Sequence, residues 1–263
     1  MFQKIRQRLA FSRIAWPHFS PAVVTIAAIC TAVFLIQSVA NHLIFPPGHR
    51  LGNLLNYVFG LHWPLLRSGC FWQPVTYNFL HGSWWHLALN MLTLLFFGSA
   101  VEMLVGTRRF WTLYLVAGIV GGIGWMIFNG LEPAFWLAVQ RLPGPIWIGL
   151  AQRWAEQQPI GPFGVCIGAS AAVFGLIGAF ATLCPDRELL LLVLFVIPVR
   201  MRAKRLAVLL MLVTVAQLVI GWGQVAYAAH LAGGLAGFLL ARRWRELLIL
   251  PRSMVWVATE PRP

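Results

Sequence analysis

The sequence predicts an all-α membrane protein that folds as a bundle of six transmembrane helices. Its 263 residues are 59% hydrophobic and only 10% charged, whereas a soluble domain carries about 25% charged residues. Six apolar stretches each approach the ~20 residues that cross the hydrocarbon core. They cover residues 21–37, 84–106, 110–128, 165–183, 206–221 and 226–241.

Lysine and arginine gather in alternate connections, and this distribution sets the orientation. Six crossings place both chain ends on one side, and sixteen of the 20 basic residues then lie there. The positive-inside rule assigns that side to the cytoplasm. The net charge of +13 is thereby explained by orientation and by contact with membrane lipid. We expect no nucleic-acid partner, because no basic soluble domain is present.

These patterns divide the chain into three parts. We expect a basic cytoplasmic segment at 1–20, a six-helix membrane domain at 21–245 with its core at 71–241, and a cytoplasmic tail at 246–263. The motif Ser38-Val39-Ala40 resembles a signal-peptidase site, and the arginine-rich start resembles a mitochondrial presequence. A retained signal-anchor explains the first stretch better, and the orientation explains the arginines. A multi-pass protein of a bacterial inner membrane fits best.

The connections between the stretches differ in character. Residues 42–71 form an apolar outer loop, which we expect to lie in the membrane interface. Residues 129–164 form a second outer segment, with apolar residues at helical spacing that predict short amphipathic helices. Residues 189–205 are apolar and then basic, so they are interpreted as a cytoplasmic turn. A crossing there would make seven and would move His230 to the opposite side from Ser170.

The cysteines indicate neither a redox centre nor a zinc ribbon. No Cys-x-x-Cys pair occurs among the four cysteines. They are expected to be small buried side chains, although a Cys70–Cys166 disulfide on the outer side remains open. No cofactor or metal is expected.

A serine and a histidine stand near the outer ends of the fourth and sixth stretches. Ser170 lies about five residues into the fourth, or ~7 Å below its start, and His230 lies at a similar depth. A serine hydroxyl needs a base within hydrogen-bond reach to attack an amide, and histidine titrates near neutrality. Small residues such as Gly168, Gly233 and Gly237 let two helices approach closely in lipid. We therefore predict a Ser170–His230 catalytic dyad without a carboxylate.

The second stretch brings further polar residues to the same level. His86 and Asn90 are four residues apart and share one helix face. Their N–H groups, with the backbone N–H of Ser170, are candidate donors to an oxyanion. His81 lies in the entry turn. A three-histidine zinc site built from His81, His86 and His230 is an alternative, but it leaves Ser170 unexplained.

These spaced motifs resemble the rhomboid family of intramembrane serine proteases. The matching elements are His81-x4-His86-x3-Asn90, Gly168-Ala169-Ser170 and Ala229-His230-x-x-Gly233-x3-Gly237. Trp72 is similar to the family's tryptophan in the first outer loop. The resemblance implies Ser170 and His230 as the dyad, His86 and Asn90 at the oxyanion, and a water-filled cavity open to the outer side.

Three residues depart from the family pattern. Gln73 follows Trp72 where many members have arginine, so a loop contact is expected to differ. Ala171 follows Ser170 where many members have glycine, and its methyl group is positioned to crowd the nucleophile. Phe174 stands where some members have a tyrosine that packs on the histidine, so the ring is kept without the hydroxyl.

The leading hypothesis is a serine endopeptidase that cleaves transmembrane segments of membrane proteins near their outer ends. Its partners would be those substrates and membrane lipid. The alternative is a non-catalytic rhomboid-like chaperone or adaptor that binds membrane helices. A transporter with a polar midplane site is disfavoured, because the sequence shows no repeated halves.

Overall fold

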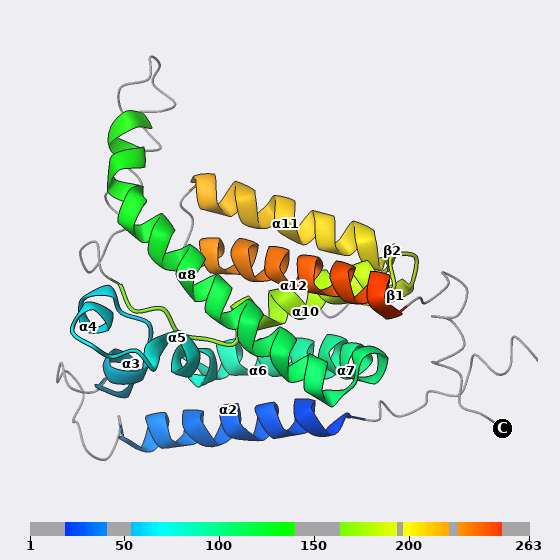
Figure 1. Cartoon of the computed structure of the whole chain (residues 1–263), viewed down its shortest axis with the longest axis horizontal. Helices are drawn as coiled ribbons and strands as arrows, with labels where there is room; N and C mark the ends of the chain where they lie inside the picture. Colours follow the sequence, from blue (N-terminus) through cyan, green and yellow to red (C-terminus); the bar gives the residue numbers. More distant parts are fainter. Residues whose placement is uncertain (1–18, 41–53, 140–163, 194–196, 221–225, 249–263) are drawn as a thin grey trace, which may run out of the picture.

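The computed structural model describes residues 19–40, 54–139, 164–193, 197–220 and 226–248. The described chain is mostly helical. Figure 1 shows the long helices running lengthwise beside one another, with the short helices α3, α4 and α5 at one end and a β-hairpin at the other. Ser170 begins a helix and His230 lies in the first turn of another, so the ends of the helices matter most for function.

Four helical stretches of the described chain are long and apolar enough to cross a membrane. The third extends beyond its apolar part, so residues 129–139 continue the helix instead of starting a separate one. The remainder of the expected outer segment, 140–164, lies almost entirely outside the described residues. The four stretches are α2 (Pro21–Val39), the run α6 (Trp84–Thr93), η4 (Leu94–Gly98) and α7 (Ser99–Val105), the apolar part of α8 (Thr107–Val139), and α11 (Ala203–Ile220).

The other two expected crossings differ from a simple transmembrane helix. The fourth, α10 (Ser170–Leu183), has 14 residues and is therefore only ~21 Å long. The expectation that this helix starts near residue 165 is wrong, because residues up to Ala169 precede the helix and Gly168 has a φ of 124°. The sixth, α12 (Tyr227–Leu248), has 22 residues but carries arginines in its last turns.

One end of the bundle holds a compact loop region. It consists of α3 (Leu54–Phe59), α4 (Trp63–Arg67), α5 (Gln73–Thr76) and η3 (Tyr77–Phe79). Leu61 and Cys166 exchange two backbone hydrogen bonds of 2.9 Å, which tie this region to the approach to α10. The four cysteines are free thiols, so the Cys70–Cys166 disulfide is not formed. Burial raises the pKa of the Cys166 thiol to about 12, so it stays protonated.

The connection between α10 and α11, at the opposite end of the bundle (Figure 1), is a β-hairpin. Strands β1 (Glu188–Val193) and β2 (Ile197–Arg202) pair antiparallel. Neither strand is long enough to span the membrane. The expectation that residues 189–205 turn back without crossing agrees with this arrangement, and the side of the membrane on which they lie stays a prediction. Its apolar run favours extended β structure, since leucine and valine alternate easily on a pleated strand.

A buried carboxylate lies at the same end of the bundle as the hairpin. Glu102 of α7 accepts hydrogen bonds from the backbone N–H groups of Ala22 and Val23, both at 3.2 Å, and from the hydroxyl group of Ser20. Thr107 donates a further hydrogen bond of 2.8 Å. Helix N-termini have unpaired N–H groups and a partial positive charge. Glu102 therefore caps α2 and fixes it to the end of α7.

Candidate active site

Ser170 is the first residue of α10. The structure corrects its expected depth, because the helix begins at the serine instead of five residues before it. Gly168 makes this start possible: its φ of 124° is unfavourable for any residue with a side chain. A Cβ atom at Gly168 would also lie 2.6 Å from the His86 ring. The sequence therefore needs glycine at this position for two independent reasons.

His230 lies in the first turn of α12, and its ring meets the serine. The distance from His230 Nε2 to Ser170 Oγ is 2.8 Å, within the range for proton transfer between a nucleophile and its base. His230 is buried, with 8% of its surface exposed. The sequence predicted this pairing from two residues 60 positions apart.

An aromatic ring holds the imidazole of His230. Phe174, one turn after Ser170 on α10, stacks on His230 with ring centroids 4.3 Å apart and an interplanar angle of 7°. Tyr227 approaches the same imidazole edge-on, at 6.4 Å. The sequence left open what orients His230 without a carboxylate. Stacking on Phe174 fixes the plane of the ring and needs no tyrosine hydroxyl.

Glycines allow the two helices to come close enough for this contact. A Cβ atom at Gly233 would collide with the carbonyl of Ala171, and one at Gly237 would collide with the backbone of Gly175. The backbones of α10 and α12 are therefore in direct contact along this seam. Such packing in lipid depends on small residues, since larger ones keep the helix axes apart.

The methyl group of Ala171 packs away from the dyad. A Cβ atom built at Gly121 of α8 would lie 2.5 Å from Cβ of Ala171, so that methyl group faces α8. Ala171 is fully buried. Glycine at position 121 leaves space for this methyl group, and its effect on the nucleophile stays a prediction.

His86 is held in the first turn of α6 with one ring nitrogen directed toward the start of α10. The hydroxyl oxygen of Ser83 caps the helix by accepting a hydrogen bond of 3.1 Å from the His86 N–H. The Gly82 N–H donates to His86 Nδ1 at 3.4 Å. Since Nδ1 accepts, the proton of the neutral ring resides on Nε2. Nε2 and Cε1 of this ring both lie 2.6 Å from a Cβ atom built at Gly168.

Asn90 lies one turn further along α6 and is buried. Its amide Nδ2 donates a hydrogen bond of 2.9 Å to the carbonyl oxygen of His86. One N–H of the amide is therefore used within its own helix. A side-chain amide has two such donors, so a second remains for the site.

His81 is buried, with 1% of its surface exposed, and its ring centroid lies 5.1 Å from that of His86. The side-chain amide of Gln37 of α2 makes two hydrogen bonds of 3.2 Å to the backbone of His81. Its Oε1 accepts from the His81 N–H, and its Nε2 donates to the His81 carbonyl oxygen. Burial lowers the pKa of His81 to about 4, with the His86 ring acting in the same direction. Among the described residues, His81, His86 and His230 do not form a group that could hold a metal ion.

The outer loop is held by a residue that the sequence marked only as a departure. Gln73 is fully buried; its Nε2 donates to the carbonyl oxygens of Tyr57 and Val58, and its Oε1 accepts from the His62 N–H at 3.0 Å. Trp72 adds an indole hydrogen bond of 3.0 Å to Val58. Gln73 thus makes the loop contact by amide hydrogen bonds. The sequence gave no signal for its partners, which lie 11 to 16 residues away.

Comparison with known sequences identifies the type of domain that this chain contains. The rhomboid-domain family model matches residues 68–245. Rhomboid protein 1, mitochondrial, of Saccharomyces cerevisiae is 32% identical over 161 residues, covering 61% of this chain and 38% of that protein. Presenilin-associated rhomboid-like protein A, mitochondrial, of Danio rerio is 26% identical over 198 residues, covering 75% and 42%.

A bacterial relative matches a shorter segment. Rhomboid protease GluP of Bacillus subtilis is 42% identical over 65 residues, covering 25% of this chain and 13% of that protein. The chain thus spans less than half the length of each of these three relatives. Two of them are mitochondrial by name. The comparisons therefore support a membrane protein, and they do not support its assignment to a bacterial inner membrane.

Proposed function

The chain belongs to the rhomboid family, and we propose that it is an intramembrane serine endopeptidase acting through a Ser170–His230 dyad. The substrates would be transmembrane segments of membrane proteins, cleaved near their outer ends. The single observation that carries this proposal is the 2.8 Å contact between Ser170 Oγ and His230 Nε2.

In the first step, Ser170 Oγ bonds to the carbonyl carbon of the scissile peptide while its proton moves to His230 Nε2. Nε2 accepts that proton because the neutral imidazole carries its own on Nδ1. His230 then gives the proton to the departing amine nitrogen, and an acyl ester of Ser170 remains. Water attacks the ester, and its proton returns through His230 to Ser170 Oγ as the acid product leaves.

The oxyanion formed in each half-reaction needs donors close to Ser170. The backbone N–H of Ser170 is the first of α10 and has no acceptor within the helix. The positive end of the α10 dipole supports the same charge. The Nε2–H of His86 and the second N–H of Asn90 are proposed as side-chain donors. Removal of one such donor typically lowers kcat by 10²–10³.

We also propose the six-crossing topology with both termini in the cytoplasm, and with it the division into residues 1–20, 21–245 and 246–263. In this arrangement α10 and α12 are the fourth and sixth crossings. The short α10 fits if the site opens to water from the outer side, since a helix of ~21 Å starts below the outer headgroups. Substrate segments would enter at this level.

The test is labelling and cleavage in the intact membrane. We expect a fluorophosphonate probe to label the wild-type protein at Ser170, and Ser170→Ala and His230→Ala to lower cleavage of a transmembrane substrate by at least about a thousandfold. Ser68→Ala, in the outer loop, is the matched control and should keep both activities. Absence of labelling in the folded wild-type protein would favour a non-catalytic helix-binding chaperone or adaptor. Cleavage that persists in Ser170→Ala would reject the dyad.

A further inference from the structure

The β1–β2 hairpin carries an unusual amount of apolar sequence for a connection at the end of a bundle. Residues 189–199 are eleven consecutive apolar residues. Leu189 packs on the hydrophobic core, but Leu190 is 64% exposed. A continuous apolar run is costly in water, at about 25 cal/mol per Å². The proposed protease chemistry does not use this hairpin.

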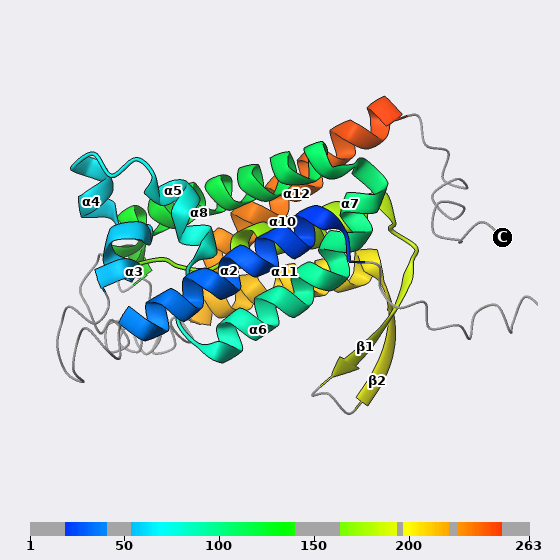
Figure 2. The same cartoon turned by 90° about the horizontal axis from the view of Figure 1, so that it is seen from below.

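The hairpin lies at the level where the lipid-facing surface of α11 begins. Val208 is 58% exposed and Leu212 is 62% exposed. Val208 is only three residues, or ~4.5 Å, beyond the basic end of the hairpin at Arg205. Figure 2 shows the two strands running crosswise to the helices and projecting beyond them. A segment with this direction runs along the membrane surface.

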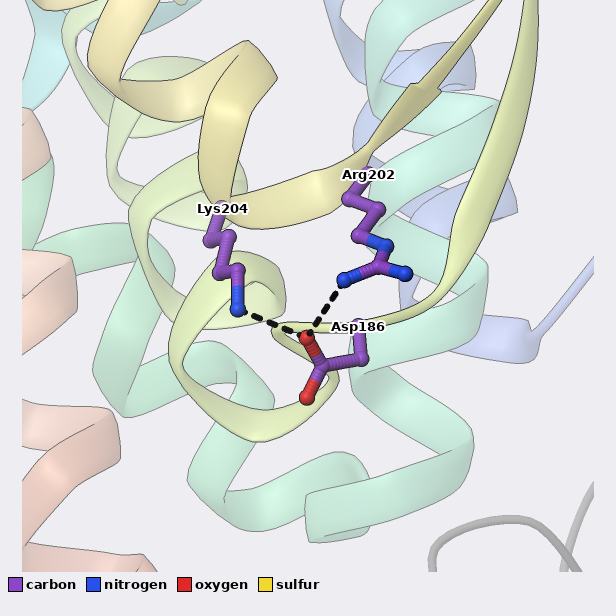
Figure 3. A network of polar contacts seen from close by, with 3 residues as sticks. All are labelled: Asp186, Arg202 and Lys204. Carbon is purple, nitrogen blue, oxygen red and sulfur yellow. Dashed lines mark hydrogen bonds and ion pairs between the residues drawn. The ribbon is translucent and has the colours of Figure 1, made fainter.

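Basic side chains surround the base of the hairpin. Asp186 holds Lys204 at 2.7 Å and lies 3.9 Å from Arg202, as Figure 3 shows. Within the described part of the chain, neither Arg200 nor Arg205 enters an ion pair. Both line a hollow of about 250 Å³ together with Glu188, Met201 and Arg202.

The net positive charge at this end of the hairpin favours the binding of an anion. Residues 186–205 contain five basic and two acidic side chains, and arginine binds phosphate through paired N–H groups. An apolar pair of strands that ends in a cluster of basic residues is typical of a segment that lies in a membrane interface.

We propose that the β1–β2 hairpin is an anchor in the inner leaflet, with its apolar part among the acyl chains and Arg200 and Arg205 bound to the phosphates of anionic phospholipids. The inner leaflet carries negative lipid, so the charges are complementary. A soluble acidic partner would match the arginines but would leave the apolar run without cover. The proposal rests on the proposed orientation, which places this end of the bundle at the inner leaflet, and it holds whether or not the dyad is active.

The anchor would fix the inner end of α11. This helix is the least packed of the four candidate spans, with 17% of its apolar window buried inside the protein. Since protein contacts hold it weakly, lipid contacts of Arg205 in its first turn would restrain its position.

The first experiment measures the depth of the hairpin. A nitroxide is attached at Leu190→Cys in the full chain, with Cys70 and Cys184 replaced by serine, in bilayers containing phosphatidylglycerol. We expect greater collision with oxygen than with a water-soluble nickel complex. Arg108→Cys, exposed at the other inner turn, is the headgroup-level reference. A label at Leu190 that is as accessible to nickel as this reference overturns the proposal. So does a short dipolar distance between two copies, which would indicate strand pairing between proteins.

The second experiment tests the phosphate contacts by mass spectrometry of lipid bound to the intact protein. We expect Arg200→Gln/Arg205→Gln to lower the preference for phosphatidylglycerol over phosphatidylcholine by roughly fivefold per charge removed. Arg108→Gln/Arg109→Gln removes the same charge from the other inner turn and should have a smaller effect. An equal effect of the two pairs would show that only general surface charge matters and would refute a specific contact at the hairpin.

Discussion

Helices α12 and α11 both pack against α10, yet they do so in opposite ways. Along α12, Gly233 and Gly237 bring the backbone against α10 with no room for a side chain. Along α11, the long apolar side chains face outward, and Leu212 is 62% exposed. The helix with the more continuous apolar sequence is therefore the less buried one.

This contrast shows what positions a reactive pair in a membrane. Apolar side chains gain little by leaving lipid for protein, so they do not bring helices together. Small residues do, because they let backbones touch. The contact of Ser170 with His230 lies at the end of the glycine seam, where a shift of about 1 Å would break a hydrogen bond.

The largest effect should come from filling the seam. Gly237→Leu places a side chain on the backbone of Gly175, and overpacking of this kind costs about 3 kcal/mol or more. Unfolding of the purified protein in mixed micelles would measure this loss. Leu235→Ala, on the exposed face of the same helix, is the control and should remain close to the wild-type value. Comparable losses of stability in both variants would contradict the role of the glycine seam in packing α12 against α10.

A smaller effect is expected from the ring that orients His230. Phe174→Leu keeps apolar volume but removes the stacked contact at 4.3 Å, so we expect a loss of about 1 kcal/mol of stability. Under the proposed function, substrate cleavage should fall several-fold, while Phe174→Tyr should retain it. Cleavage assays at matched protein levels would decide. Unchanged cleavage in Phe174→Leu would mean that another group orients the imidazole.

The Ala171 methyl group provides a third test. Ala171→Gly should lower the free energy of unfolding by about 1 kcal/mol, because it removes a packed methyl group from a helix. It should not accelerate cleavage, since that methyl group faces Gly121. A faster enzyme would show that alanine at this position does obstruct the nucleophile.

The smallest change is expected on the lipid side of α11. Leu212→Ala should alter the free energy of unfolding by no more than about 0.5 kcal/mol, because the side chain contacts lipid in the folded and unfolded states alike. The same unfolding assay measures it. A loss as large as that of Gly237→Leu would remove the distinction between the two helices.

Sequence patterns predicted much of the site. The alternation of basic connections and apolar stretches predicted which polar residues lie at the same depth in the membrane. The spacing of glycines predicted that α10 and α12 touch. The patterns failed at the start of α10, where the five residues from Val165 to Ala169 precede the helix instead of forming its first turn. Composition does not reveal this difference, because valine, cysteine and isoleucine suit both states in a membrane protein. They also failed to identify the buried partners of Gln73 and Glu102.

The sequence by itself determined that this chain is a membrane protein, where its polar residues lie along the apolar stretches, and where its helices need small side chains. These properties are local, since each depends on residue type and spacing. Tertiary structure alone decided that Ser170 begins its helix, that the Ala171 methyl group packs against α8, and that the inner turn is a hairpin across the bundle. Each of these depends on a neighbour distant in the chain, whose steric or hydrogen-bonding demand selects one of several conformations that the local sequence permits.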